Sequence, residues 1–149
     1  MGSASFKKKV GAYKATGQTR YLEEALAVCA AQCDKGADIL DFNLDSDLAS
    51  GPACPARGAL GALLQLASAD PKVAKVPFML CSCEWETIKE GLRYVQGKCI
   101  VNGLSLSLGE QEFLRIAGQC KAHGAALVIL PLTDTCEPAE TREDKVRIC

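Results

Sequence analysis

The chain has 149 residues, the usual length of one domain, and 48% of them are hydrophobic, which is enough for a buried core and argues against disorder. Its 17 basic and 18 acidic residues give a net charge of −1, so neither a nucleic acid nor an anionic membrane is an expected partner. The basic cluster Lys7–Lys9 is interpreted as the solvated face of a helix.

Hydrophobic spacing predicts helices that alternate with strands along the chain. The helix expected first, Ser3–Lys14, has no strand before it. In the next, Thr19–Lys35, apolar side chains recur at helical spacing, and Gly36 ends it. A loop rich in Asp, Ser, Gly and Pro is expected at Leu44–Pro55. The remaining predicted helices are Ala56–Ala69, Glu84–Gln96, Leu108–His123 and one that starts within Glu137–Cys149.

Four strands are predicted between these helices, and they are nearly continuous apolar runs. Such runs are typical of strands covered on both faces, and strands that alternate with helices form a parallel sheet. The sequence therefore predicts an α/β fold. The four predicted strands are Ala37–Asn43, Val76–Ser82, Cys99–Leu104 and Ala125–Leu132.

The longest apolar run, Ala125–Leu132, is far shorter than the ~20 residues that a membrane-spanning helix needs. The lysines near the N-terminus are followed by the polar stretch Tyr13–Arg20 rather than by the apolar core of a signal peptide. We therefore expect a cytoplasmic protein with no membrane partner.

The nine cysteines are odd in number and irregularly spaced, with no Cys-x-x-Cys pair and a single histidine, His123. Zinc sites need paired ligands at short spacing, so no metal site is predicted. Most of the cysteines are expected to be reduced thiols that act as small buried apolar residues. The alternative is a metal or redox role for Cys81 or Cys83.

Polar residues appear where each predicted strand ends. In parallel α/β folds these ends point the same way and ligands bind there. Carboxylates and amides suit a flat heterocycle that carries several N–H donors and a carbonyl. A turn or capping role competes with this interpretation, and we favour it for Asp45 and Ser105. The residues predicted to converge on one ligand site are Asp41, Asn43, Ser82, Asn102 and Asp134.

Several common chemistries lack their sequence motifs. No Gly-x-Gly-x-x-Gly or Gly-Lys-Ser/Thr loop follows a strand, which disfavours nucleotide binding. A Gly-x-Ser-x-Gly elbow is missing too, and His123 falls at a predicted helix end, so a Ser-His-Asp or Cys-His arrangement is not supported.

Two sequence blocks carry a specific resemblance. The run from Gly36 to Asp45 is similar to Gly-Ala-x-Ile-Ile-Asp-Ile-Asn-Met-Asp, and the run from Gln96 to Asn102 is similar to Gln-Gly-Lys-x-Ile-Val-Asn. Both patterns belong to the methyltetrahydrofolate-binding domain of cobalamin-dependent methionine synthases. Shorter matches at Gly2–Lys7, Asp70–Pro77 and Gly124–Ala126 extend the resemblance over essentially the whole chain.

The resemblance implies a (β/α)₈ TIM-type barrel that binds 5-methyltetrahydrofolate at its carboxyl-end mouth, and this chain would supply about its first half. In that family the methyl group passes to cobalamin on a separate domain, so no cofactor is expected to bind this chain directly. The resemblance places Asp41 and Asn43 in the pterin site and gives Asn102 a hydrogen bond to the pterin ring.

The chain departs from the family pattern at the end of the strand Val76–Ser82. The family has Asp-Ser-Ser there, and its Asp anchors the pterin, whereas this sequence has Cys81-Ser82-Cys83. Loss of a carboxylate that accepts two N–H bonds costs on the order of 2–4 kcal/mol, or ~30- to 1000-fold in affinity. The fifth family strand ends in Phe-Asp-Glu, so Asp134 is the candidate substitute, one position along.

The strand that opens the family's barrel and its last three strands have no counterpart, and four strands cannot close a barrel of ~250 residues. We therefore expect residues 1–149 to form a single incomplete pterin-binding domain that is inactive alone. Its expected partners are a folate and the remaining methionine synthase domains or chains. The alternatives are a non-catalytic folate-binding or assembly derivative and an independent open sheet with chemistry at Cys81 and Cys83.

Overall fold

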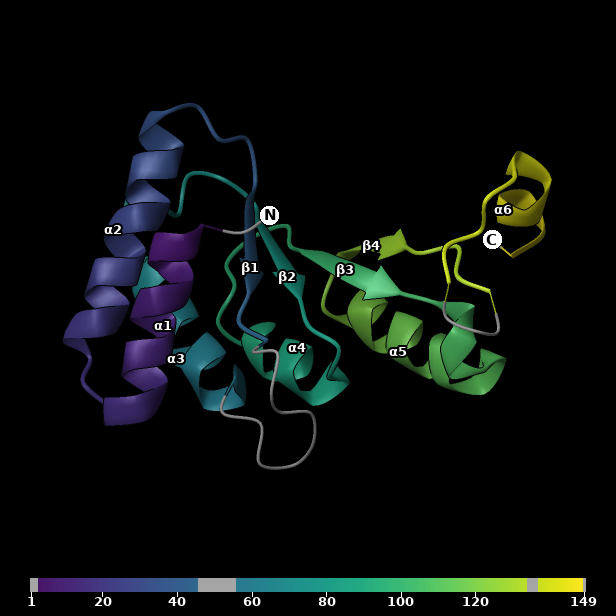
Figure 1. Cartoon of the computed structure of the whole chain (residues 1–149), viewed down its shortest axis with the longest axis horizontal. Helices are drawn as coiled ribbons and strands as arrows, with labels where there is room; N and C mark the ends of the chain where they lie inside the picture. The colour runs from purple at the N-terminus through teal and green to yellow at the C-terminus, as the bar shows by residue number, and fades with distance from the viewer. Residues whose placement is uncertain (1–2, 46–55, 134–136, 149) are drawn as a thin grey trace.

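A four-stranded parallel sheet in the order β1-β2-β3-β4 forms the centre of the computed structural model, which describes residues 3–45, 56–133 and 137–148 (Figure 1). Neighbouring strands pair in sequence order and each pair is parallel, so all four carboxyl ends lie at one edge. The strands are β1 (Leu40–Asn43), β2 (Phe78–Cys81), β3 (Ile100–Leu104) and β4 (Ala126–Ile129).

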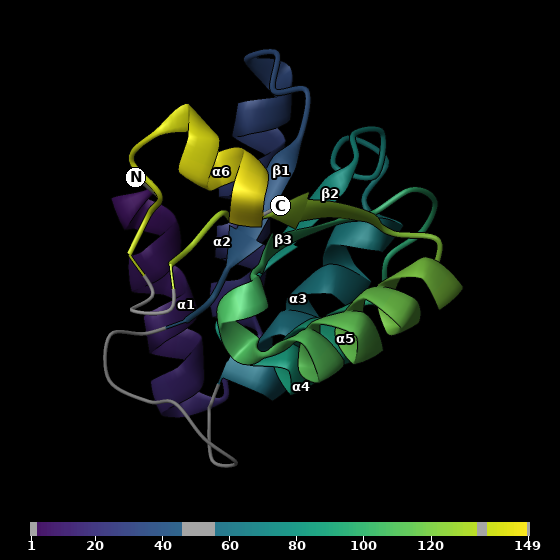
Figure 2. The same cartoon turned by 90° about the vertical axis from the view of Figure 1, so that its right-hand side faces the viewer.

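Helices connect the strands and, as Figures 1 and 2 show, α2 to α5 form an arc along one side of the curved sheet, with α1 packed against α2. The predicted α/β class is therefore confirmed, as the arrangement of a partial TIM-type barrel. The helices are α1 (Ala4–Thr16), α2 (Arg20–Asp34), α3 (Ala56–Ala69), α4 (Trp85–Gly91), α5 (Glu110–Ala122) and α6 (Arg142–Ile148), with the 3₁₀ turn η1 (Leu106–Leu108) before α5.

All four strands begin later than predicted, and two of them do so because the residues before the strand complete a helix end. After α2, Gly36 adopts φ 89° and the Ala37 N–H donates to the Gln32 carbonyl. This bond closes the helix terminus, so β1 starts at Leu40 rather than at Ala37. The Ala125 N–H bonds back to the Cys120 carbonyl in the same way, and β4 starts at Ala126.

The predicted helix 84–96 is too long. The helix α4 ends at Gly91, after which the Arg93 N–H donates to the Glu90 carbonyl and the Tyr94 N–H to the Gly91 carbonyl. These three-residue bonds are tighter turns than an α-helix makes. The helix predicted at 108–123 begins only at Glu110, because the chain first forms η1.

The core lies between the sheet and the helix arc. Alternate strand residues point into it, and the Phe42 and Phe78 rings meet edge to face with centroids 5.1 Å apart. Helix α3 supplies fully buried Leu60, Leu63 and Leu64. The opposite side, called the open face below, is exposed or half-buried, and it is formed by Asp41, Asn43, Met79, Cys81, Ile100 and Asn102.

The buried-thiol prediction is confirmed for four of the six cysteines that the structure describes. Burial raises the pKa of the Cys29 thiol to about 12 and that of Cys99 to about 11, so both are neutral at pH 7. The four buried thiols are Cys29, Cys33, Cys99 and Cys120, while Cys54, Cys136 and Cys149 lie outside the described residues. None of the helices in the described ranges is long and apolar enough to cross a membrane.

Candidate functional site

A row of polar side chains crosses three adjacent strands at the carboxyl edge of the open face. Asn43 on β1 pairs in register with Cys81 on β2, and Cys81 pairs with Asn102 on β3. Partners in a parallel ladder point to the same face, so the three side chains lie next to one another. Asp41 lies two residues back along β1, on the same face. The structure thus brings together three of the five predicted site residues, with Cys81 between the two amides.

The Asn43 amide contacts both the row and the following loop. Its Nδ2 donates to Cys81 Sγ at 3.4 Å, and its Oδ1 accepts the Asp45 N–H at 3.0 Å. A sulfur is a weak acceptor, so Nδ2 still has donor capacity toward a ligand. The contact orients the amide over the end of β2.

Asp45 bridges two strand ends that are far apart in the chain. Its Oδ1 accepts the Ser82 hydroxyl at 2.8 Å and its Oδ2 accepts the Cys83 N–H at 2.7 Å. Ser82 Oγ in turn accepts the Glu84 N–H at 3.1 Å. Asp45 was predicted to stabilise a local turn. Its carboxylate instead makes long-range contacts that hold the β2–α4 connection in place. The Ser82 hydroxyl, predicted to face a ligand, is already engaged in this bridge.

Ser105 has the predicted local role. Its Oγ accepts the Ser107 N–H at 3.2 Å and caps η1, and the residue is buried. Asp134 lies outside the described residues, so its place in the site stays a prediction.

Two pKa shifts describe the electrostatics of the open face. The pKa of the Cys81 thiol is raised, first by burial and then by the carboxylates of Asp41 and Asp45. The pKa of Asp41 is also raised. Neighbouring atoms partly remove water from its carboxylate, although much of the residue's surface is still accessible to solvent. A neutral thiol is a poor nucleophile and metal ligand. The shift at Cys81 is therefore opposite in direction to the lowered pKa that thiolate chemistry would need.

The carboxyl edge also contains a cavity of about 360 Å³ between α4 and α5, in which Ser82 and Asn102 take part. Sequence reasoning identified those two residues as site candidates but missed Ser107 and Glu112. Ser107 and Glu112 follow the end of β3 by three and eight residues, and this position after a strand is the signal that could have found them. The residues that line the cavity include Ser82, Cys83, Trp85, Ile88, Val101, Asn102, Gly103, Leu104, Ser105, Ser107, Leu108, Glu112, Ile116 and Leu132.

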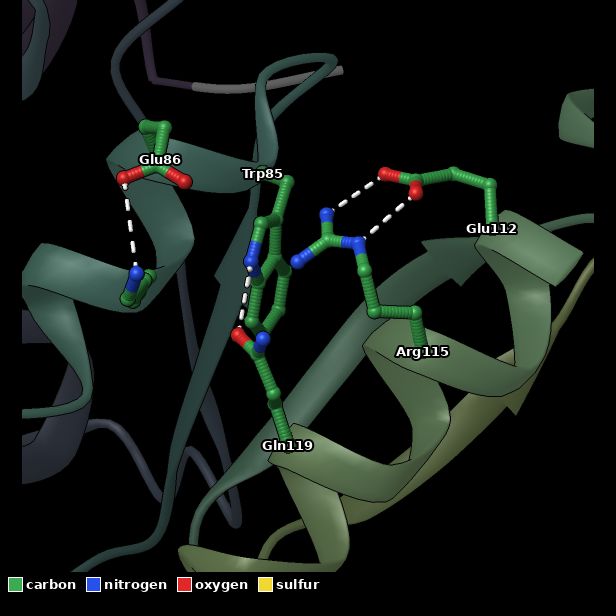
Figure 3. A network of polar contacts seen from close by, with 6 residues as sticks. Trp85, Glu86, Glu112, Arg115 and Gln119 are labelled. Atoms are coloured by element: carbon green, nitrogen blue, oxygen red, sulfur yellow. Dashed lines mark hydrogen bonds and ion pairs between the residues drawn. The ribbon is translucent and has the colours of Figure 1, made fainter.

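One hydrogen bond joins α4 to α5 beside the cavity, and an ion pair within α5 lies next to it (Figure 3). The Trp85 Nε1–H donates to Gln119 Oε1 at 3.0 Å. Arg115 donates through Nη2 and Nε to both carboxylate oxygens of Glu112, at 2.5 and 2.7 Å. This bidentate pair lowers the pKa of the Glu112 carboxyl, which stays ionised.

Within the ranges 3–45, 56–133 and 137–148, no group of three or more His, Cys, Asp and Glu side chains is arranged to hold a metal ion. The acceptors and donors at the carboxyl edge are instead amides, hydroxyls and carboxylates. Such groups recognise an organic heterocycle by hydrogen bonds.

The comparison with protein families agrees with this chemistry. The family model described as pterin binding enzyme matches residues 13–149, which is most of the chain and includes all four strands. The match also spans the row Asn43, Cys81 and Asn102. The parallel sheet, its polar carboxyl edge and this match together establish that the chain belongs to the pterin binding enzyme family.

Proposed function

We propose that this chain is the pterin-binding portion of a methionine-synthase-type methyltransferase and that its ligand is 5-methyltetrahydrofolate. The family match supports a pterin as the ligand class. The finer assignment rests on the two sequence blocks that resemble methionine synthases, which end at Asp45 and Asn102. In the structure these blocks form β1 and β3, on either side of β2.

The observation that carries the proposal is the row Asn43–Cys81–Asn102 on the open face, with Asp41 two residues from Asn43. A pterin ring presents both N–H donors and acceptors along its edge. A carboxamide offers an acceptor oxygen and two N–H donors, so Asn43 and Asn102 can each pair with such an edge. Asp41 supplies the carboxylate that pairs with ring N–H groups.

The proposed reaction is transfer of the N5 methyl group to a corrinoid that another domain holds. Protonation near N5 makes the pterin amine a better leaving group, and this chain's residues bind and orient the ring for that step. Residues 1–149 then form a single incomplete barrel domain in the cytoplasm. The missing strands and the zinc, homocysteine and corrinoid sites come from other domains or chains.

A calorimetric titration with 5-methyltetrahydrofolate tests the proposal. We expect saturable binding with a Kd below about 100 μM. In Asn102→Ala the affinity should fall at least about tenfold, because the hydrogen bonds between the uncharged amide and the pterin are lost. The matched control is Gln96→Ala, which removes an exposed amide at the other end of the same sequence block. A folded, monodisperse protein that binds no pterin would refute the proposal.

A second function, a non-catalytic folate-binding or assembly derivative, is favoured by one observation. The anchoring carboxylate of the family is replaced by Cys81, whose raised pKa leaves it uncharged at pH 7. The test combines the chain with the corrinoid-binding part of a methionine synthase and follows methyl transfer. Binding of the folate without transfer would favour the derivative, and transfer would favour the enzyme.

A further inference from the structure

The cavity between α4 and α5 has the composition of a ligand pocket. Its volume of about 360 Å³ falls in the ~300–1,000 Å³ range of small-molecule sites. Buried Ile88, Val101 and Ile116 line it from the core side. Its polar lining residues come from the carboxyl ends of β2 and β3 and from η1 and α5. They are Ser82, Asn102, Ser105, Ser107 and Glu112.

One wall of the cavity is an aromatic ring in a fixed orientation. Trp85 is half-buried at the start of α4, and its indole N–H is held by Gln119 of α5. Figure 3 shows Gln119 and Arg115, both on α5, pointing toward this indole ring. A ring held from the neighbouring helix loses little freedom when a second ring packs on it, so it suits stacking.

The cavity meets the row of polar side chains at Asn102, which belongs to both. A bulge shifts the register between Asn102 and Leu104, and Gly103 within it adopts φ 106°. The bulge leaves Asn102 on the open face but turns Leu104 toward the core, where it is buried and lines the cavity. Gly103 adds no side chain between the two. A ligand held by Asn102 therefore lies beside the cavity.

The charge of the cavity lining favours an uncharged part of a ligand over an anionic one. Of the described residues that line the cavity, Glu112 alone is charged, and Arg115 balances it from outside. An anionic group inside would meet the Glu112 carboxylate and an apolar floor, at a large desolvation cost. A neutral flat ring gains contact with the indole and the isoleucines instead.

We propose that this cavity binds the p-aminobenzoyl ring of the folate, stacked on Trp85, while the pterin ring contacts Asn102 and the glutamate carboxylates stay in solvent. This inference rests on the proposed function, since it assigns a second subsite to the same ligand. It makes Trp85 a residue that distinguishes a folate from a pterin without the benzoyl group.

The test compares two ligands, 5-methyltetrahydrofolate and 5,6-dimethyltetrahydropterin, which has no benzoyl ring. Their Kd values are measured by calorimetry for the wild type, Trp85→Ala and Trp85→Phe. We expect Trp85→Ala to weaken folate binding about tenfold, as loss of a stacking partner does, and to change binding of the pterin less than twofold. Trp85→Phe keeps a ring and should restore most of the folate affinity.

A second variant covers the case in which Trp85→Ala does not fold. Ser107 is half-buried on the rim, and its contact with Ser105 uses only its backbone N–H, so Ser107→Phe fills the cavity without removing that bond. We expect Ser107→Phe to weaken the folate selectively. Equal effects on both ligands, or none, would overturn the subsite while leaving the proposed function in place. A wild type that binds neither ligand would overturn both.

Discussion

The two faces of the sheet are made by alternate residues of the same strands, yet their surroundings differ. On the side that faces the helix arc, Phe42 is 1% exposed and Leu80 is fully buried. On the open face, their chain neighbours Asp41 and Asn43 are exposed and Met79 and Cys81 are half-buried. Because the strand period is two, a step of one residue moves a side chain from the core to the candidate site.

Because of this difference, residues on one face of each strand should affect the stability of the fold and residues on the other face should affect ligand binding. Substitutions on the helix-covered face should act on the free energy of unfolding, because they open cavities in a packed core. Substitutions on the open face should act on pterin affinity and leave the core intact. Adjacent residues of one strand therefore form matched pairs for experiments.

The largest expected effect is that of Leu80→Ala on the helix-covered face. Leu80 is fully buried, and the ideal Cβ position of Gly91 on α4 lies 3.0 Å from its Cδ1, so the site is tightly packed. We expect a loss of about 3 kcal/mol in the free energy of unfolding, measured by urea denaturation.

Met79→Ala is the control for Leu80→Ala, since it removes a similar volume from the open face one residue away. Met79 is half-buried, so we expect a cost of about 1 kcal/mol. Equal losses for the two variants would contradict the assignment of the faces.

Next in size is the gain expected from Cys81→Asp on the open face. This change restores the carboxylate that the methionine-synthase resemblance places between Asn43 and Asn102. Two charge-assisted hydrogen bonds to the pterin should raise its affinity by ~30- to 1000-fold, or about 2–4 kcal/mol, in a calorimetric titration.

Cys81→Ser provides the matched control, because it introduces a polar group of similar size without charge. We expect Cys81→Ser to change the affinity less than about fivefold. An unchanged affinity in Cys81→Asp would mean that the pterin does not reach the end of β2, and the proposed ligand geometry would be wrong.

The sequence predicted the four parallel strands and their polar ends because these signals are local, with boundary errors of a few residues. It was wrong about the two faces, since the strands were expected to be covered on both sides, whereas buried residues of β1 and β2 alternate with exposed or half-buried ones. Two of the boundary errors arose because a helix end uses the first residue of the predicted strand, at Ala37 and at Ala125. The family likeness then gave the barrel type.

The sequence could not predict contacts that join distant segments. The bonds from Ser82 and Cys83 to Asp45 span 37 and 38 residues, and the Trp85–Gln119 bond spans 34 residues. No local pattern encodes such pairs, since each depends on how neighbouring strands and helices are placed. The cavity was missed for the same reason, although most of its lining follows strand ends.

A smaller effect is expected from Asp45→Ala, which tests whether the bridge between β1 and β2 is specific. Its carboxylate accepts the Ser82 hydroxyl and the Cys83 N–H, both partly exposed to solvent. We expect a loss of about 1–2 kcal/mol in the free energy of unfolding and faster hydrogen exchange at the Cys83 amide.

Asp38→Ala removes the same charge from an exposed position just before β1, and we expect it to change stability by less than about 0.5 kcal/mol. If both aspartates gave the same small loss, the bridge would contribute nothing beyond net charge.

The smallest expected effect concerns the pH dependence contributed by Asp41. Its pKa is raised by partial desolvation, so the folded state binds the Asp41 proton more tightly than the unfolded state does. Ionised Asp41 then costs stability, and the cost appears as the pH rises from the usual Asp value of 3.8 through the raised pKa. Asp41→Asn should therefore be more stable than wild type at pH 7, by about a few tenths of a kcal/mol because solvent screens an exposed group.

Urea unfolding of wild type and Asp41→Asn between pH 3 and pH 7 measures this difference. The two curves should converge at the acid end and separate as the pH rises. Pterin affinity should fall in Asp41→Asn over the range in which stability increases, since the same carboxylate that is costly in the free protein becomes the partner of ring N–H groups in the complex. A variant that gained stability and kept its pterin affinity would place Asp41 outside the ligand site and limit the binding face to the two amides.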